Sequence, residues 1–131
     1  MMILIPDTHT LIWYLSDDPK LGRKARVALS RREGIEIVIP IIVLFEISYL
    51  QKRKSLPVSL ADIRHWIAGN SHVRVHPIDI SILDGAPLNL EIHDAIIVGT
   101  ALTLSGADGN EVHVVSVDAE INACKNINII W

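Results

Sequence analysis

A short apolar run that ends in an acid and leads at once into a helical pattern is the strongest constraint on this 131-residue chain. Residues 2–5 read Met-Ile-Leu-Ile, and Pro6-Asp7 breaks the run. Apolar residues within 11–15 then recur at a spacing that places them on one face of a helix. The pattern predicts a strand ending at Asp7. Helix capping is the commoner role of such an Asp, but ligands of a parallel sheet bind at the carboxyl ends of its strands.

The same pattern returns near the other end of the chain. Residues 112–115 read Val-His-Val-Val, Ser116-Val117-Asp118 follows, and a short helical segment spans 119–123. Because the carboxyl ends of parallel strands meet at one edge of a sheet, we expect Asp118 to share that edge with Asp7.

Strand and helix patterns alternate through the rest of the chain. Such alternation predicts an α/β fold, in which right-handed crossovers place helices on both faces of a parallel sheet. The further predicted strands are 36–39, 73–76 and 128–131, the predicted helices are 21–32, 41–51, 59–69, 78–83 and 94–104, and a turn is predicted at 107–110.

Two more acids lie on predicted helices. Glu46 has Ile42 and Leu50 one turn away on either side, so it either reaches solvent along a half-exposed helix or is buried, paired, neutralised or bound to a metal. Asp94 opens a helix that is apolar nearly all round, and capping alone would explain it. If these two acids converge with Asp7 and Asp118, an all-carboxylate cluster suits Mg²⁺ or Mn²⁺ better than zinc.

Composition narrows the class of protein. Half of the residues are hydrophobic, which suggests that a partner covers some apolar surface. The longest apolar run, 37–45, is too short for a bilayer and contains Pro40, so we expect a soluble, cytoplasmic protein without a membrane segment. The single cysteine, Cys124, is expected to be a buried, inert thiol.

Charge divides the chain into two unequal halves. The net charge is −3, but residues 1–64 hold ten Lys/Arg against seven Asp/Glu, and residues 65–131 hold two against eight. This asymmetry permits a basic rim beside an acidic centre. The residues that could contact phosphates, or could form only solvated helix faces, are Arg23, Lys24, Arg26, Lys52, Arg53 and Lys54.

Four blocks of the sequence carry a family resemblance. Residues 3–13, Glu46 within its apolar helix, residues 93–102 and residues 114–118 resemble, in order and spacing, the blocks of a PIN domain. They are most similar to the VapC-type toxins of toxin–antitoxin pairs, and the match covers essentially the whole chain. Pro6, Ala95 and Gly99 depart from the residues usual in the family, without removing a metal ligand.

The resemblance implies a single PIN-like domain over residues 1–131, folded as a three-layer α/β/α sandwich with a central parallel sheet. It implies a Mg²⁺- or Mn²⁺-dependent endoribonuclease that cleaves RNA with metal-activated water, is inhibited by a small antitoxin protein and forms a homodimer or a higher oligomer. The catalytic and metal-binding acids would be Asp7, Glu46, Asp94 and Asp118, with Ser116 in support.

Three alternatives bear on the function. A haloacid-dehalogenase-type phosphatase also begins with a strand and an acid, but it needs a second Asp where this chain has His9. A non-catalytic α/β binding module could keep the acids for folding or partner contacts. A PIN nuclease could also act in RNA processing without an antitoxin.

Overall fold

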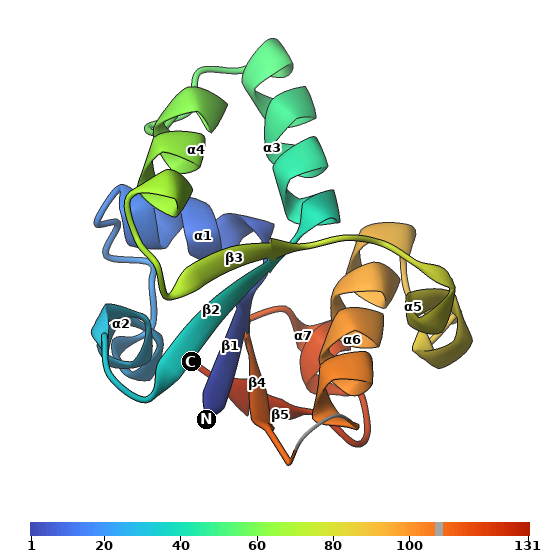
Figure 1. Cartoon of the computed structure of the whole chain (residues 1–131). Helices are drawn as coiled ribbons and strands as arrows, with labels where there is room; N and C mark the ends of the chain where they lie inside the picture. Colours follow the sequence, from blue (N-terminus) through green and yellow to red (C-terminus); the bar gives the residue numbers. More distant parts are fainter. Residues whose placement is uncertain (107–108) are drawn as a thin grey trace.

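A five-stranded sheet with the strand order β3-β2-β1-β4-β5 forms the centre of the computed structural model, which describes residues 1–106 and 109–131 (Figure 1). Every strand pair is parallel. The predicted α/β/α sandwich is confirmed. The strands are β1 (Met2–Pro6), β2 (Ile35–Pro40), β3 (Val73–His76), β4 (Glu111–Val115) and β5 (Asn128–Ile130), and the helices are α1 (Thr8–Leu15), α2 (Arg23–Ser30), α3 (Ile41–Arg53), α4 (Leu60–Ala68), α5 (Ile80–Gly85), α6 (Ile92–Ser105) and α7 (Ala119–Asn122).

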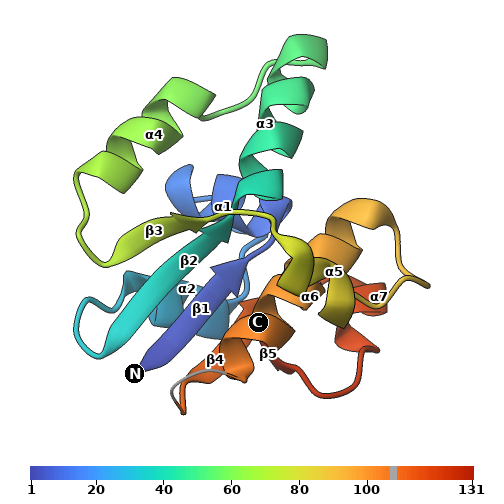
Figure 2. The same cartoon turned by 45° about the vertical axis from the view of Figure 1, so that its right-hand side comes forward.

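Connections run in opposite directions across the two halves of the sheet. Helices α1 to α4 connect β1 to β2 and β2 to β3, whereas α5 to α7 connect β3 to β4 and β4 to β5. Right-handed crossovers place these two groups of helices on opposite faces of the sheet. In both views α3 and α4 extend beyond the carboxyl ends of the strands (Figures 1 and 2). The described part of the chain holds no helix with the length and apolar character of a membrane span.

The three central strands are buried on both faces. Leu4 and Ile5 of β1, Ile37 and Ile39 of β2, and Val114 of β4 have no exposed surface. Their continuous apolar runs are what a parallel sheet covered by helices on both sides requires. The core therefore holds the carboxyl ends of β1 and β4 firmly in place.

Strand register brings the two predicted strand-end acids to the same level. Strands β1 and β4 pair over five residues and finish with Pro6 opposite Val115. The amide of Asp7 continues the ladder by donating to the Val115 carbonyl at 3.2 Å. The chain therefore leaves the sheet at Asp7 and at Ser116 side by side.

Pro6 stands where the sheet tolerates a missing donor. Met2 donates its amide to Gly34, on the β2 side, and Asp7 donates to β4, so even-numbered amides of β1 face β2. Pro6 has no N–H to offer β2. Pairing between β1 and β2 accordingly ends with Leu4, two residues before the proline.

Helix α6 is enclosed, as its sequence predicted. Gly99 in the middle of the helix permits a close approach of α5, because a Cβ atom there would lie 2.9 Å from the carbonyl oxygen of Ile82. Helix α5 begins at Ile80, two residues later than predicted, because Asp79 caps it by accepting from the amides of Ser81 and Ile82.

Some other expectations differ from the structure. The basic helix predicted over 21–32 is shorter and spans Arg23–Ser30. Cys124 is only half-buried, although its partial burial raises the pKa of the thiol. The turn predicted at 107–110 falls partly on 107 and 108, outside the described residues.

Candidate acidic site at the carboxyl edge of the sheet

Asp7 both caps a helix and faces the second strand-end loop. Its Oδ1 accepts a hydrogen bond from the Thr10 amide at 3.0 Å, which makes Asp7 the N-cap of α1. Its Oδ2 accepts the hydroxyl of Ser116, at the end of β4. The capping and site-residue interpretations are therefore compatible, because each uses a different oxygen.

Ser116 joins the two loops that carry acids. Its side chain is fully buried, donates to Asp7 and accepts the Asp118 amide at 3.0 Å. A single hydroxyl thus fixes the Asp7 carboxylate relative to the backbone that carries Asp118. The supporting role that the family resemblance implies for Ser116 stays a prediction.

Asp118 repeats the arrangement of Asp7 at the neighbouring strand. Its Oδ1 accepts the amides of Glu120 at 2.8 Å and Ile121 at 3.1 Å, which makes Asp118 the N-cap of α7. Both carboxylates are therefore held at helix N-termini, where amide donors and the helix dipole favour negative charge.

Asp94 does not open its helix, contrary to the sequence-based expectation. Helix α6 begins at Ile92, and Glu91 caps it by accepting the amides of His93 and Asp94. Two extra residues before Asp94 adopt helical geometry because Glu91 supplies the cap. The Asp94 carboxylate lies in the first turn and is left free to face the other acids.

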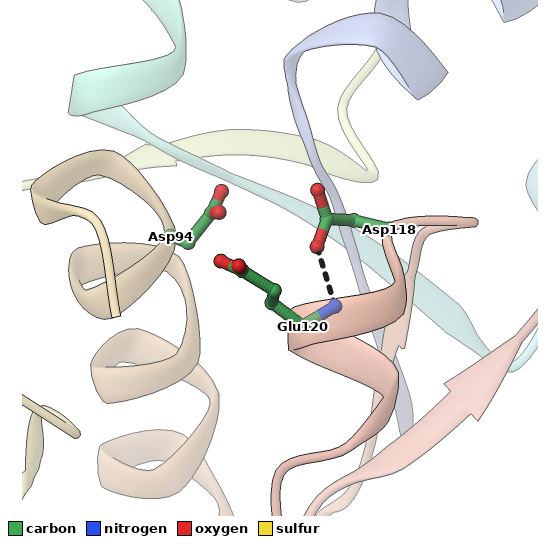
Figure 3. Close-up of side chains that lie close together, drawn as sticks. All are labelled: Asp94, Asp118 and Glu120. Carbon is green, nitrogen blue, oxygen red and sulfur yellow. Dashed lines mark hydrogen bonds between the residues drawn. The ribbon is translucent and has the colours of Figure 1, made fainter. Parts of the chain in front are cut away.

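Three carboxylates converge between α6 and α7. Asp94, Asp118 and Glu120 each offer an oxygen, and these oxygens lie within 4.8 Å of one another. Asp94 points across from the start of α6 toward the two acids on the opposite segment (Figure 3). Glu120 was not among the predicted residues. The signal for it was the Asp-Ala-Glu sequence at the start of a short helix, which carries two acids into one turn.

The pKa of Asp94 is raised to about 6. Burial is the largest cause, and the charges of Asp118, Glu91, Asp7 and Glu46 add to it in that order. Each of these carboxylates is therefore close enough to disfavour the ionised form of Asp94. A bound cation would reverse this penalty.

Glu46 lies half-buried on α3 and is tied to the loop after β1. The Thr8 hydroxyl, itself buried, donates to Oε1 of Glu46. Thr8 directly follows Asp7, so this bond sets Glu46 beside the first strand-end acid. Neither Asp7 nor Glu46 belongs to the group of three within 4.8 Å, and a single pocket shared by all four predicted acids stays a prediction.

A hollow of about 250 Å³ adjoins the acids. It is lined by the acids Asp7 and Asp118 and by His9, Trp13 and Val117. We call Asp7 and Asp118 the acidic wall of this hollow, and His9 and Trp13 its aromatic wall.

The predicted basic residues take up different positions. Arg26 pairs with Asp17 and also donates to the Asp18 carbonyl at 2.8 Å, so its charge is used within the fold. Lys52 lies over the ring of Tyr49, 5.7 Å from its centroid, in the last turns of α3. A role for either group in binding RNA stays a prediction.

The oxygen ligands at this site restrict the kind of metal ion that it can bind. Carboxylate oxygens suit a hard divalent cation such as Mg²⁺ or Mn²⁺. Two of the acids are fixed by backbone amides, and Asp94 gains from the positive charge. The arrangement can therefore hold a cation at the carboxyl edge of the sheet, next to a hollow that is open to a ligand.

Comparisons with known proteins agree with this geometry. The PIN domain family matches residues 4–124. Similar solved structures include VapBC2 from Rickettsia felis bound to a DNA fragment from its promoter (13% identity, TM-score 0.69, covering 98% of this chain and 97% of that one) and DNA-bound VapBC from Salmonella typhimurium (18% identity, TM-score 0.68, covering 98% and 97%). VapBC-1 from nontypeable Haemophilus influenzae is another (15% identity, TM-score 0.66, covering 98% and 96%). No curated protein sequence matches the chain. The match over nearly its whole length shows that the chain belongs to the PIN domain family.

Proposed function

We propose that this protein is a metal-dependent endoribonuclease and the toxin of a VapBC-type toxin–antitoxin pair, active in the cytoplasm. The observation that carries the proposal is the convergence of Asp94, Asp118 and Glu120 within 4.8 Å, in a chain of the PIN domain family. Carboxylates packed this closely repel one another, and the charges of neighbouring acids add to burial, the largest cause, in raising the pKa of Asp94. A divalent cation is the simplest ligand that makes such a cluster favourable.

Each acid has a distinct part in the proposed site. Asp94 and Asp118, with Glu120, would bind Mg²⁺ or Mn²⁺ directly, and Asp7 would complete the site from the end of β1. Glu46, held by Thr8, would orient a water or a further cation ligand. The bound cation would supply a water of lowered pKa and neutralise charge on the phosphodiester that is cut.

The exposed apolar surface of the protein indicates where partner proteins could bind. A hollow of about 470 Å³ lies between α3 and α4, and another of about 500 Å³ lies around α5 and the start of α6. Ile80 and Leu88, which line the second hollow, are more than two-thirds exposed. Apolar surface of this kind marks interaction sites. We propose that a small antitoxin covers part of it, as the similarity to toxin–antitoxin complexes suggests, and that a second copy of the chain covers another part.

The experiment compares two capping aspartates. Asp118→Asn and Asp79→Asn remove the same charge from residues that each cap a short helix through two amides, but only Asp118 lies in the acidic cluster. Mn²⁺ binding is measured by calorimetry, and cleavage is measured on total cellular RNA. Asp118→Asn should lose both, and Asp79→Asn should keep both.

Other outcomes separate the alternatives. A wild-type protein that neither binds Mn²⁺ nor cuts RNA would favour a non-catalytic binding module. A wild-type protein that cuts RNA, but whose gene has no neighbouring antitoxin able to inhibit it, would favour a nuclease of RNA processing.

A further inference from the structure

The aromatic wall of the 250 Å³ hollow consists of two side chains from one helix. His9 and Trp13 lie one turn apart on α1 and therefore on the same face of that helix. Their ring centroids are 5.8 Å apart, with an angle of 46° between the planes. The helix that Asp7 caps thus presents two rings beside the carboxylates.

A second tryptophan packs against Trp13. Trp131 packs edge-on against it, with centroids 5.9 Å apart and planes at 65°. Gly22 permits that contact, because a Cβ atom there would come within 2.7 Å of Trp131. The half-buried Trp13 ring is therefore fixed in position rather than free to move into solvent.

A cation stands over the same ring. The Nζ atom of Lys20 lies 5.9 Å from the centroid of Trp13, and Lys20 itself is exposed. Among the described residues, Lys20 has no carboxylate within ion-pair distance. Its charge is thus available to an anion near the aromatic wall.

These features select one kind of ligand. A flat aromatic ring beside a fixed indole gains stacking energy, and a phosphate attached to it gains from Lys20. The acidic wall, with its proposed cation, would hold a neighbouring phosphate. Val117, which is about half exposed, offers an apolar contact at the edge of the hollow.

We infer that the hollow binds the base of a nucleotide next to the phosphate that is cut, stacked on Trp13 and flanked by His9, with Lys20 near its phosphate. The inference rests on the proposed ribonuclease function. Every base has a π-face, so Trp13 contributes affinity with little sequence preference. His9 adds ring nitrogens that can bond to a base edge, so it is the residue that would confer preference.

The test uses matched tryptophan variants. Trp66 on α4 is also half-buried, but it packs against Tyr14 of α1 and does not line the hollow. Trp13→Leu, Trp13→Phe and Trp66→Leu are compared with wild type in single-turnover cleavage of a random-sequence pool of single-stranded RNA 12-mers with Mn²⁺. Trp13→Leu should raise the half-saturating protein concentration by roughly five- to hundredfold, with little change in the maximal rate. Trp13→Phe and Trp66→Leu should stay close to wild type.

A second measurement does not depend on how Trp13→Leu folds. One RNA that the wild-type protein cuts is resynthesised with an abasic nucleotide at each position around the cut. An abasic nucleotide at one position next to the cut should weaken binding of the RNA to wild type. The same RNA should lose a similar factor of affinity for the folded Trp13→Phe variant. If no adjacent abasic position weakens binding, the stacking inference is wrong.

The remaining outcomes are separable. A wild type that cuts no RNA with Mn²⁺ overturns the proposed function itself. In a second outcome, the wild type cuts RNA while the folded Trp13→Leu variant has the same half-saturating concentration as Trp66→Leu. That result would overturn only the inference that a base stacks on Trp13. If Trp13→Leu leaves RNA cleavage unchanged but weakens inhibition by the antitoxin, the hollow is a protein-binding site and the inference also fails.

Discussion

Acids at the ends of strands and acids on long helices are held in different ways in this site. Asp7 and Asp118 follow β1 and β4, and backbone amides at helix N-termini bind their oxygens. Glu46 on α3 receives one threonine hydroxyl. Among the described residues, the side chain of Asp94 on α6 accepts no hydrogen bond, and its pKa is raised to about 6.

The strand-end acids are fixed in position by hydrogen bonds, whereas Asp94 differs from them mainly in how readily it ionises. The strand-end acids have fixed donors, so their positions do not depend on a cation. Asp94 lacks such donors, so its protonation depends on which charges lie nearby. A cation should therefore change the behaviour of Asp94 most while the strand-end acids stay in place.

The largest expected effect comes from a strand-end acid. Asp7→Asn should lower RNA cleavage by roughly 100-fold or more, since it removes a charge from the proposed cation site. Asn caps helices as well as Asp does, so the metal-free unfolding temperature should stay level or rise. Cleavage is measured with Mn²⁺ and unfolding by calorimetry, with the exposed Asp84→Asn as the control. A variant that unfolds at a clearly lower temperature would make Asp7 mainly structural.

The next effect tests the packing that supports Asp94. Gly99→Ala places a methyl group 2.9 Å from the Ile82 carbonyl and should lower the free energy of unfolding by about 1 to 3 kcal/mol. Gly106→Ala is the control, because its nearest neighbour would be 3.7 Å away. Both are measured by urea unfolding. Equal stability of the two variants would mean that α5 can shift away from α6 without cost.

A smaller effect isolates the charge of Asp94. Its pKa is about 6 in the folded chain against 3.8 as the reference value, so the folded state holds the proton more tightly. The resulting stability is complete below about pH 4 and is lost as the pH rises through 6. Because solvent screens a half-buried group, we expect wild type to lose roughly 0.5 to 1 kcal/mol more than Asp94→Asn between pH 5 and pH 8 without metal. Parallel pH curves for the two proteins would contradict this.

The smallest effect concerns the far end of α3, the helix that carries Glu46. Replacing Lys52, Arg53 and Lys54 together with Gln should weaken RNA binding and reduce its salt slope, while Mn²⁺ affinity stays the same. Each lost phosphate contact removes roughly 0.7 from the slope for single strands. Anisotropy titrations at several salt concentrations measure it. An unchanged slope would show that these residues form only a solvated helix end.

Sequence patterns predicted the strands and helices that depend on the residues within one short segment. Apolar runs broken by an acid located β1 and β4. The start of α6 was wrong because Glu91, three residues before Asp94, supplies the cap. Glu120 was missed because its direction depends on how α7 sits against α6. The cap by Glu91 is a local contact that the apolar spacing does not reveal, whereas the direction of Glu120 depends on contacts between segments.

The proline at the end of β1 restricts insertions and deletions in this strand. Removing one residue from β1 would turn its side chains to the opposite face of the sheet. It would also move Pro6 onto the side where amides donate to β4, and so break the ladder that leads to Asp7. Insertions and deletions in this strand are thus doubly disfavoured, whereas substitution of Pro6 by an aliphatic residue only adds a donor toward β2. Natural variation should therefore change the identity of this residue freely while leaving its position untouched.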